Sequence, residues 1–332
     1  MNYLQKEFIQ FHEAIKLYEN AENSILREKR DMLTKELRTY FDQKSKAEGT
    51  AKITFDVRNQ GSYSMATGIK PIDGDYDIDV MVLFNIDIKD YPNPTIVKKW
   101  VKGALERPGR TIVYKNPCVT VQYLKNGLPA FHVDLALYGN RNDIWGNQTY
   151  ISKGKPGANT NDRAWEISNP EELKTKINNR FSNAEESAQM RRVIRYLKRW
   201  KDLKFKNSGN GKPTGIAITA LVYNLFQPSV FGFFSSTSDP DDIRALKALV
   251  QRILDQFRWM NNCDWNEHTI SVKLPVVPGN DLFVKMTCKQ HQAFKEKLIE
   301  LKNALSDAER SNINPATKIL RKQFGNDFPL IT

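Results

Sequence analysis

The feature that most limits what this chain can fold into is an acidic stretch that runs directly into an apolar one. Asp75, Asp77 and Asp79 alternate with other residues, and residues 80–84 are continuously apolar. Because residues two apart in a β-strand point to the same side, the Asp77 and Asp79 carboxylates share one face. The opposite face of this predicted buried strand carries Ile78, Val80 and Val82.

Two carboxylates on one face of a strand repel each other unless a cation lies between them. Mg²⁺ is often bound through one or two carboxylates together with substrate phosphates. A surface strand with solvated acids is the alternative, but the apolar run after Asp79 indicates a buried strand, which favours a metal site. Asp75 and Asp77 are another conceivable pair. Gly74, which precedes Asp75, suggests a turn there and favours Asp77 and Asp79.

A third carboxylate comes from a second apolar segment, residues 131–137. Asp134 is the only acid in this predicted strand. A buried aspartate that caps a backbone turn is the alternative, but the first pair of acids favours a metal ligand. His132 shares the face of Asp134, although an edge histidine with a hydrogen bond is the more usual explanation.

A Gly-Ser pair, Gly61-Ser62, follows an alternating, strand-like segment at 53–58 and precedes the acidic strand. Glycine allows a tight turn with close approach of the backbone, and serine offers a hydroxyl and an amide to phosphate oxygens. The pair alone is only a loop pattern. Its position before the acids is what makes it a candidate phosphate contact.

Residues 190–201 have helical spacing and many basic side chains. Val193, Leu197 and Trp200 form an apolar stripe. Lys198 and Lys201 lie along one edge of that stripe, where a lysine can bury its stem and present its ammonium group to a cleft. A solvated basic helix is the usual alternative for such a run.

Taken together, these features resemble the DNA polymerase β-like nucleotidyltransferases. More narrowly, they resemble the bacterial CD-NTases, relatives of cyclic GMP-AMP synthase and oligoadenylate synthase. The resemblance extends from about residue 50 to the end of the chain. The matching residues are Gln60-Gly61-Ser62-Tyr63, Thr67, Ile69-Lys70-Pro71, Tyr76-Asp77-Ile78-Asp79, Asp134, residues 193–200, residues 319–325 and Phe328-Pro329.

This resemblance implies an α+β, bilobed fold with a mixed sheet backed by a long N-terminal helix. It implies a nucleotidyltransferase core over residues 1–165 and a mainly helical, oligoadenylate-synthase-like lobe over 166–332 that closes the active-site cleft. The implied catalytic residues, which also hold two Mg²⁺ or Mn²⁺ ions, are Asp77, Asp79 and Asp134. The implied nucleotide contacts are Gln60, Gly61, Ser62, Lys198, Lys201 and Thr214.

Members of this family make cyclic di- or trinucleotide signals in antiphage defence. The resemblance therefore implies nucleotidyl transfer from nucleoside triphosphates, ATP among them, with release of pyrophosphate. A template-independent transferase that acts on RNA ends or on a protein uses the same acids and remains an alternative. An inactive nucleotidyltransferase-fold sensor is a second one, which the intact set of three acids disfavours. Activation by a protein or nucleic acid stays open, and no oligomer is predicted.

Composition limits the partners and the compartment. Fifty Lys and Arg residues against 38 acids give a net charge of +12, which suits a polyanionic partner. The three cysteines are far apart with no CxxC pair, which predicts neither a disulfide nor a zinc site and indicates a reducing cytoplasm. The apolar stretch at 215–226 is too short to span a bilayer, and the N-terminus does not read as a signal sequence, so a soluble protein is expected.

The expected elements follow from periodicity. Residues 1–46 predict one long helix, residues 50–140 predict the strands, and the Gly- and Asn-rich section at 139–160 predicts loop. Asp239 is expected to cap a helix that has Pro240 in its first turn. The remaining predicted helices cover 170–180, 184–205, 216–226, 239–258 and 291–305.

Overall fold

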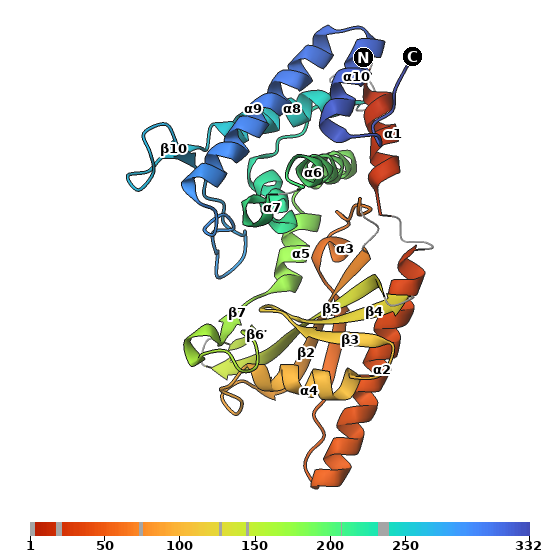
Figure 1. The fold of residues 1–332 in the computed structure, drawn as a ribbon, viewed down its shortest axis with the longest axis vertical. Coiled ribbons are helices and arrows are strands. Elements are labelled where there is room, and N and C mark those ends of the chain that lie inside the picture. Colours follow the sequence, from red (N-terminus) through yellow and green to blue (C-terminus); the bar gives the residue numbers. More distant parts are fainter. Residues whose placement is uncertain are drawn as a thin grey trace. The chain divides into compact units, whose positions relative to one another are not determined.

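The computed structural model describes residues 4–17, 22–72, 76–125, 128–143, 146–206, 208–231 and 239–332 (Figure 1). The chain forms two compact units, each made of segments that are separate in sequence. The sheet unit comprises Tyr18–Met65 and Lys70–Lys174. The helical unit comprises Met1–Leu17, Ala66–Ile69 and Thr175–Thr332. The expected division of the chain at residue 165 stays a prediction.

A mixed sheet forms the centre of the sheet unit. Its strands are β1 (Phe55–Asn59), β2 (Tyr76–Asp87), β3 (Arg110–Tyr114), β4 (Val119–Lys125), β5 (Leu128–Asp143), β6 (Gly146–Lys153) and β7 (Ala164–Ile167). The strand order is β1-β2-β5-β4-β3, with β6 paired to β5 and β7 paired to β6. Since β2 and β5 are parallel neighbours, the two acid-bearing strands predicted from the sequence lie side by side.

Two helices, α2 (Glu22–Glu48) and α4 (Thr95–Leu105), pack on one face of this sheet. Apolar residues of α2 recur at i, i+4 and i+8, so they form a single stripe that can be buried against the strands. The stripe consists of Leu33, Leu37 and Phe41. The sheet residues in the same core include Ile78, Val80, Val82, Val133 and Leu135. The prediction that these β2 residues face a core is therefore confirmed, and the acids belong to the other face.

The N-terminal segment does not form one long helix as predicted. The first helix, α1 (Gln5–Ile15), ends where Lys16 takes an extended conformation, and it belongs to the helical unit. The second, α2, belongs to the sheet unit, and residues 18–21 between them lie outside the described part. The predicted spine helix is therefore α2 alone.

The first part of the Gly- and Asn-rich section is strand, whereas residues 154–159 form a loop as predicted. Gly139 lies within β5, and β6 begins after a short connection. A Cβ atom at Gly139 would lie 2.8 Å from a methyl carbon of Ile88 and 3.5 Å from the Trp165 ring. Glycine is needed in this strand because those two side chains pack directly against its backbone.

The helical unit contains most of the remaining helices. They are α1, α6 (Ala184–Lys204), α7 (Gly215–Leu225), α8 (Asp242–Leu254), α9 (Cys288–Arg310) and α10 (Ile313–Phe324), while α5 (Pro170–Asn178) crosses the boundary in sequence. Shorter elements are α3 (Gly61–Ser64), η1 (Thr160–Asp162), η2 (Gly209–Gly211), β8 (Val230–Phe231), β9 (Asp239–Pro240), β10 (Arg258–Trp259) and β11 (His268–Thr269). The predicted helices near 170, 184 and 216 are confirmed, and α9 is longer than predicted.

The start of α8 differs from the prediction. Asp239 and Pro240 form β9, and the helix is capped by Asp241, whose side chain accepts a hydrogen bond from the Arg244 amide at 3.0 Å. An Asp two residues later provides the same capping chemistry, so the residue type was right and its position was wrong.

Helix α6 forms the centre of the helical unit. Its predicted apolar stripe is confirmed, because Val193, Leu197 and Trp200 are almost completely buried. Most of its basic residues are buried as well and have polar partners: Arg192 pairs with Asp242 at 2.8 Å, for example. The alternative of a solvated basic helix is therefore wrong.

The ends of the described chain meet in this unit. Phe8 and Phe11 of α1 contact Phe324 of α10 and Phe328 beyond it, with ring centroids 5.1–6.2 Å apart. Figure 1 shows α1 and α10 next to each other. Across the described residues, no helix combines the length and apolar character needed to cross a membrane.

Candidate active site

The register of β2 and β5 places two of the predicted acids side by side. Asp79 pairs directly with Asp134, and Asp77 pairs with His132. Paired residues of neighbouring parallel strands share a face, and neighbouring strands are about 5 Å apart. Asp79 and Asp134 therefore lie on one face of the sheet at a separation that one cation can bridge. Asp77 is placed by its backbone only, since its side chain lies outside the described part.

The Gly-Ser turn lies directly against Asp79. Gly61 has a φ of +66°, and a Cβ atom built on it would be 1.9 Å from Oδ2 of Asp79. The backbone N–H of Gln60 donates to the carbonyl of Asp79 at 3.0 Å. Glycine is therefore required at this position for two reasons: the backbone has a positive φ, and a Cβ atom would clash with the Asp79 carboxylate. Ser62 follows it within the short helix α3.

Gln60 is held by a buried tyrosine. Tyr138 donates its hydroxyl to Oε1 of Gln60 at 3.2 Å. Burial raises the pKa of Tyr138 to about 12, so its hydroxyl remains a donor at neutral pH. Tyr138 also belongs to a small apolar cluster, with Met81 and Ala136, that continues the face of the acids. The acid face is thus polar at one end of the strands and closed by apolar packing further along.

Two residues that were not predicted contact Asp134. Thr120 donates its hydroxyl to Oδ1 at 2.5 Å, and the Lys115 ammonium lies 3.2 Å from Oδ2. The Asp134 side chain is 16% exposed and that of Lys115 is 43% exposed, so the lysine reaches the acid from the solvent side. A threonine between two valines, at 119–121, was the available sequence indication of a polar contact inside a buried strand.

The turn that carries Lys115 is fixed by a buried lysine on α4. Lys98 is completely buried and donates to the carbonyls of Lys115, Asn116 and Gly154 at 2.9, 2.6 and 2.6 Å. Burial lowers the pKa of Lys98 to about 8. Three carbonyl acceptors match the three donors of an ammonium group, so one side chain satisfies three backbone groups. The same turn leads to Cys118, a buried free cysteine. Burial raises the pKa of its thiol to about 12.

The other predicted contacts belong to the helical unit. Lys198 is 6% exposed and donates to the carbonyl and the hydroxyl of Thr67 at 3.0 and 3.2 Å. A Cβ on Gly215 would lie 3.8 Å from Cε of Lys198, so the lysine lies beside the start of α7. Thr214 is exposed there and caps α7 by accepting from the Ala217 amide at 3.2 Å. The structure thus brings Lys198 and Thr214 together.

Lys201 has a different environment. It lies 3.1 Å from Asp202, which also pairs with Lys212 at 2.9 Å. Burial lowers the pKa of Lys201. A triphosphate would have to compete with Asp202 for this ammonium group, which makes Lys201 a weaker candidate contact than Lys198.

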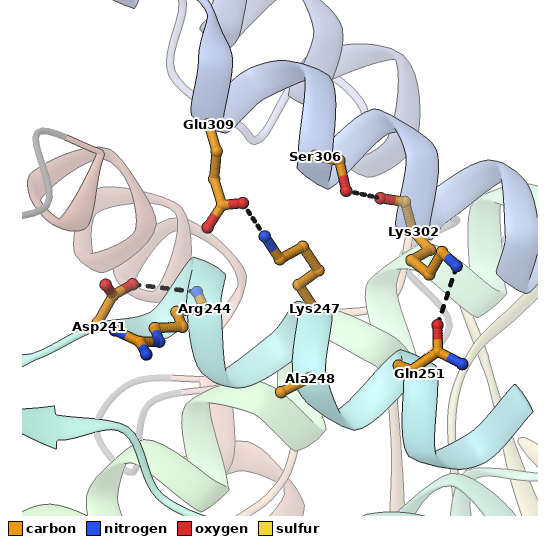
Figure 2. Close-up of a pocket in the computed structure, with 8 residues that line it drawn as sticks. All are labelled: Asp241, Arg244, Lys247, Ala248, Gln251, Lys302, Ser306 and Glu309. Carbon is orange, nitrogen blue, oxygen red and sulfur yellow. Dashed lines mark hydrogen bonds and ion pairs between the residues drawn. The ribbon is translucent and has the colours of Figure 1, made fainter. Parts of the chain in front are cut away.

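A separate pocket contains none of the predicted site residues. It lies between α8 and α9, where Lys247 pairs with Glu309 and Lys302 donates to Gln251 at 2.9 Å (Figure 2). Both lysines are already engaged with polar partners on the pocket wall. We therefore do not assign a phosphate to this pocket.

The fold is that of the DNA polymerase β-like nucleotidyltransferases. Among solved structures, the cyclic AMP-GMP synthase DncV of Vibrio cholerae in complex with the linear intermediate pppA(3′,5′)pG is similar over 97% of this chain and 96% of that chain. The TM-score is 0.71 at 17% identity. The same protein with nonhydrolyzable GTP gives a TM-score of 0.70, covering 97% of this chain and 98% of that chain at 17% identity.

Sequence comparison finds relatives for part of the chain. Residues 55–138 match the model of the cyclic GMP-AMP synthase DncV-like nucleotidyltransferase domain. A cyclic GMP-AMP synthase of Escherichia albertii is 29% identical over 165 residues, which cover 49% of this chain and 35% of that relative. The family model spans Asp77, Asp79 and Asp134, and the chain covers about a third of the length of that curated relative.

Proposed function

We propose that this chain is a metal-dependent nucleotidyltransferase that joins nucleoside triphosphates into a cyclic di- or trinucleotide and releases pyrophosphate. ATP and GTP are the proposed substrates, because structures of the similar Vibrio protein contain ATP and GTP. We further propose that the product is a second messenger in antiphage signalling, as the family resemblance implies.

One observation carries this proposal: Asp79 and Asp134 are directly paired on parallel strands, and the Gly61 turn lies against Asp79. A Cβ at Gly61 would displace the carboxylate, so the turn and the acid have matching shapes. Two hard carboxylate ligands on one face suit Mg²⁺ or Mn²⁺. The residues present therefore fit the divalent ions that the family implies.

The side chains have distinct proposed roles. Two divalent ions, when held by Asp77, Asp79 and Asp134, would supply activation of a ribose hydroxyl and charge stabilisation for the leaving pyrophosphate. Thr120 holds the Asp134 carboxylate at a fixed orientation through a 2.5 Å hydrogen bond. Ser62 and the backbone around Gly61 would orient phosphate oxygens. Lys198 would add positive charge to the triphosphate, with Gln60, Lys201 and Thr214 as further nucleotide contacts.

The test is to identify the products. Purified protein is incubated with four labelled nucleoside triphosphates and Mg²⁺ or Mn²⁺, treated with phosphatase and resolved beside Asp79→Asn. We expect small phosphatase-resistant products that the variant does not make, and omission of single triphosphates identifies the bases. The matched control is Asp56→Asn, because Asp56 is an exposed acid on the neighbouring strand β1.

Other results would point elsewhere. Label that appears only on added RNA or protein would favour the template-independent alternative. Phosphatase-resistant product at wild-type level from Asp79→Asn would contradict the site. The burial of Trp200 in α6 argues against a stacking groove for a polymer on that helix.

A further inference from the structure

The cysteines give a result that their spacing did not predict. Cys263 and Cys288 form a disulfide, with Cα atoms 5.7 Å apart although 25 residues separate them in sequence. Cys263 lies in the connection between β10 and β11, and Cys288 is the first residue of α9. The prediction of no disulfide is wrong because the fold brings a hairpin loop to the start of a helix, which sequence spacing does not reveal.

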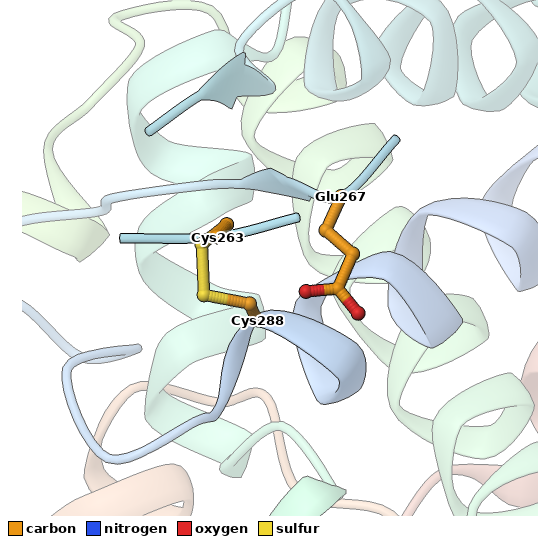
Figure 3. Close-up of side chains that lie close together, drawn as sticks. All are labelled: Cys263, Glu267 and Cys288. Carbon is orange, nitrogen blue, oxygen red and sulfur yellow. A yellow bond between two sulfur atoms is a disulfide. The ribbon is translucent and has the colours of Figure 1, made fainter. Parts of the chain in front are cut away.

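A buried acid faces this pair. Glu267 is only 8% exposed, and among the described residues its carboxylate has no hydrogen bond or ion pair. Its oxygen and the two sulfur atoms all lie within 4.8 Å of one another. Figure 3 shows the carboxylate turned toward the disulfide. The carboxylate therefore lies next to two sulfur atoms, where a cation could bridge all three groups once the disulfide is reduced.

We propose that, when reduced, Cys263 and Cys288 bind a soft divalent cation of the Zn²⁺ class together with Glu267. Thiolate sulfur and carboxylate oxygen are both zinc ligands, at about 2.3 and 2.0–2.2 Å, so three donors within 4.8 Å need only small shifts to surround one ion. The start of a helix favours negative charge, which stabilises a thiolate on Cys288. Asn262 offers two further oxygens, its Oδ1 at 3.8 Å from the Cys263 sulfur and its carbonyl at 3.8 Å from the Cys288 sulfur.

The chemistry of the exchange balances with one external reductant. A phosphine or a dithiol supplies two electrons, the S–S bond breaks, and two protons from water or the dithiol give two thiols. Metal binding then releases those two protons and forms two metal–sulfur bonds. The loop and the start of α9 stay joined in either state, by a covalent bond or by the metal.

This site is chemically distinct from the proposed catalytic one. Asp79 and Asp134 offer hard oxygen ligands suited to Mg²⁺ or Mn²⁺, whereas two thiolates select softer ions. The proposal therefore does not depend on nucleotidyl transfer, and its test needs no nucleotide.

The experiment uses the full chain, reduced with a phosphine and kept free of oxygen. Co²⁺ is titrated in as a spectroscopic probe and then displaced with Zn²⁺, while the Tm is followed in parallel. We expect one equivalent of Co²⁺ with a thiolate-to-cobalt charge-transfer band, displacement by Zn²⁺, and a higher Tm of the reduced protein with Zn²⁺. The oxidised protein should show no such band.

Variants assign the ligands. Cys263→Ser should lose the charge-transfer band, and Glu267→Gln should weaken Zn²⁺ binding by about tenfold or more. Asp264→Asn is the matched control, since Asp264 is an exposed acid on the same loop outside the cluster, and it should bind like wild type. Glu267→Gln keeps both thiols, so it tests the carboxylate even if the serine variant folds poorly. Absence of the band in reduced wild type, or wild-type affinity in Glu267→Gln, would overturn the proposal.

Discussion

At the residue scale, the site depends on close contacts that only particular side chains allow. Gly61 occupies the left-handed region, and a Cβ built on it would lie 1.9 Å from Oδ2 of Asp79. Thr120 and Lys115 then fix and neutralise Asp134. The acids and the Gly-Ser turn were predictable because alternation in a strand fixes which residues share a face. Thr120 and Lys115 were not, since their contacts depend on the pairing of β4 with β5.

Gly61→Ala should lower activity by about 100-fold or more, because the new methyl group displaces the Asp79 carboxylate. A non-glycine residue in this conformation also costs about 1–2 kcal/mol of stability. Gly109→Ala separates the two effects, since Gly109 has a φ of +85° and nothing within 4 Å of a built Cβ. Product formation and urea denaturation are measured for both. Equal activity of the two variants would contradict the close contact with Asp79.

Thr120→Val should lower activity by about tenfold to a hundredfold and raise the Mg²⁺ concentration that gives half-maximal rate, because Asp134 loses the donor that orients it. The shape of the side chain is kept, so the unfolding transition should change little. Thr111→Val, at an exposed position of β3, is the control. An unchanged Mg²⁺ dependence in Thr120→Val would show that this hydrogen bond does not position the acid.

At the element scale, single side chains join elements that are distant in sequence. Lys98 of α4 holds the turn between β3 and β4, and Arg195 of α6 reaches Gly68 and His12. The apolar stripe of α6 was predictable from its period. The burial of its basic residues was not, because their partners, such as Asp242 and Asp327, lie far along the chain.

Lys98→Met should destabilise the sheet unit by about 2–3 kcal/mol, since it leaves three carbonyls without their charged donor. Methionine fills a similar volume, so loss of packing is small. Lys99→Met changes an exposed lysine on the same helix and should leave stability nearly unchanged. Urea denaturation of the two variants gives the comparison, and equal midpoints would contradict the role of Lys98.

His12 predicts a pH dependence of stability. Burial, followed by the Arg195 charge, lowers the pKa of His12 to about 3, below its ordinary value of 6.5. Between these values the unfolded chain binds more protons than the folded one, so this group's contribution is present above pH 6.5 and is lost as the pH falls toward 3. His12→Gln keeps an acceptor for Arg195 and does not titrate. Its stability should fall less than that of wild type between pH 7 and pH 5, and an equal fall would contradict the assignment.

At the scale of the whole molecule, the two structural units do not correspond to the two halves of the sequence. Helix α1 and residues 66–69 belong to the helical unit, although both lie in the N-terminal quarter of the chain. Periodicity predicts that a segment is helical but not which core buries it. The same limit explains the disulfide, because tertiary packing brings Cys263 and Cys288 together. The strands of the sheet unit and the helix-rich C-terminal half were predictable from patterns within short segments, whereas the mixed sheet followed only from the family resemblance.

The central claim is that the paired acids of β2 and β5 perform nucleotidyl transfer. Pyrophosphate release from ATP and GTP tests this claim most directly, because the release does not depend on which acceptor is used or which product forms. We expect release by wild type with Mg²⁺ or Mn²⁺, release by the Asp56→Asn control, and none by Asp79→Asn or Asp134→Asn, each with an unchanged unfolding transition. Pyrophosphate release at the wild-type rate by either acid variant would contradict the account.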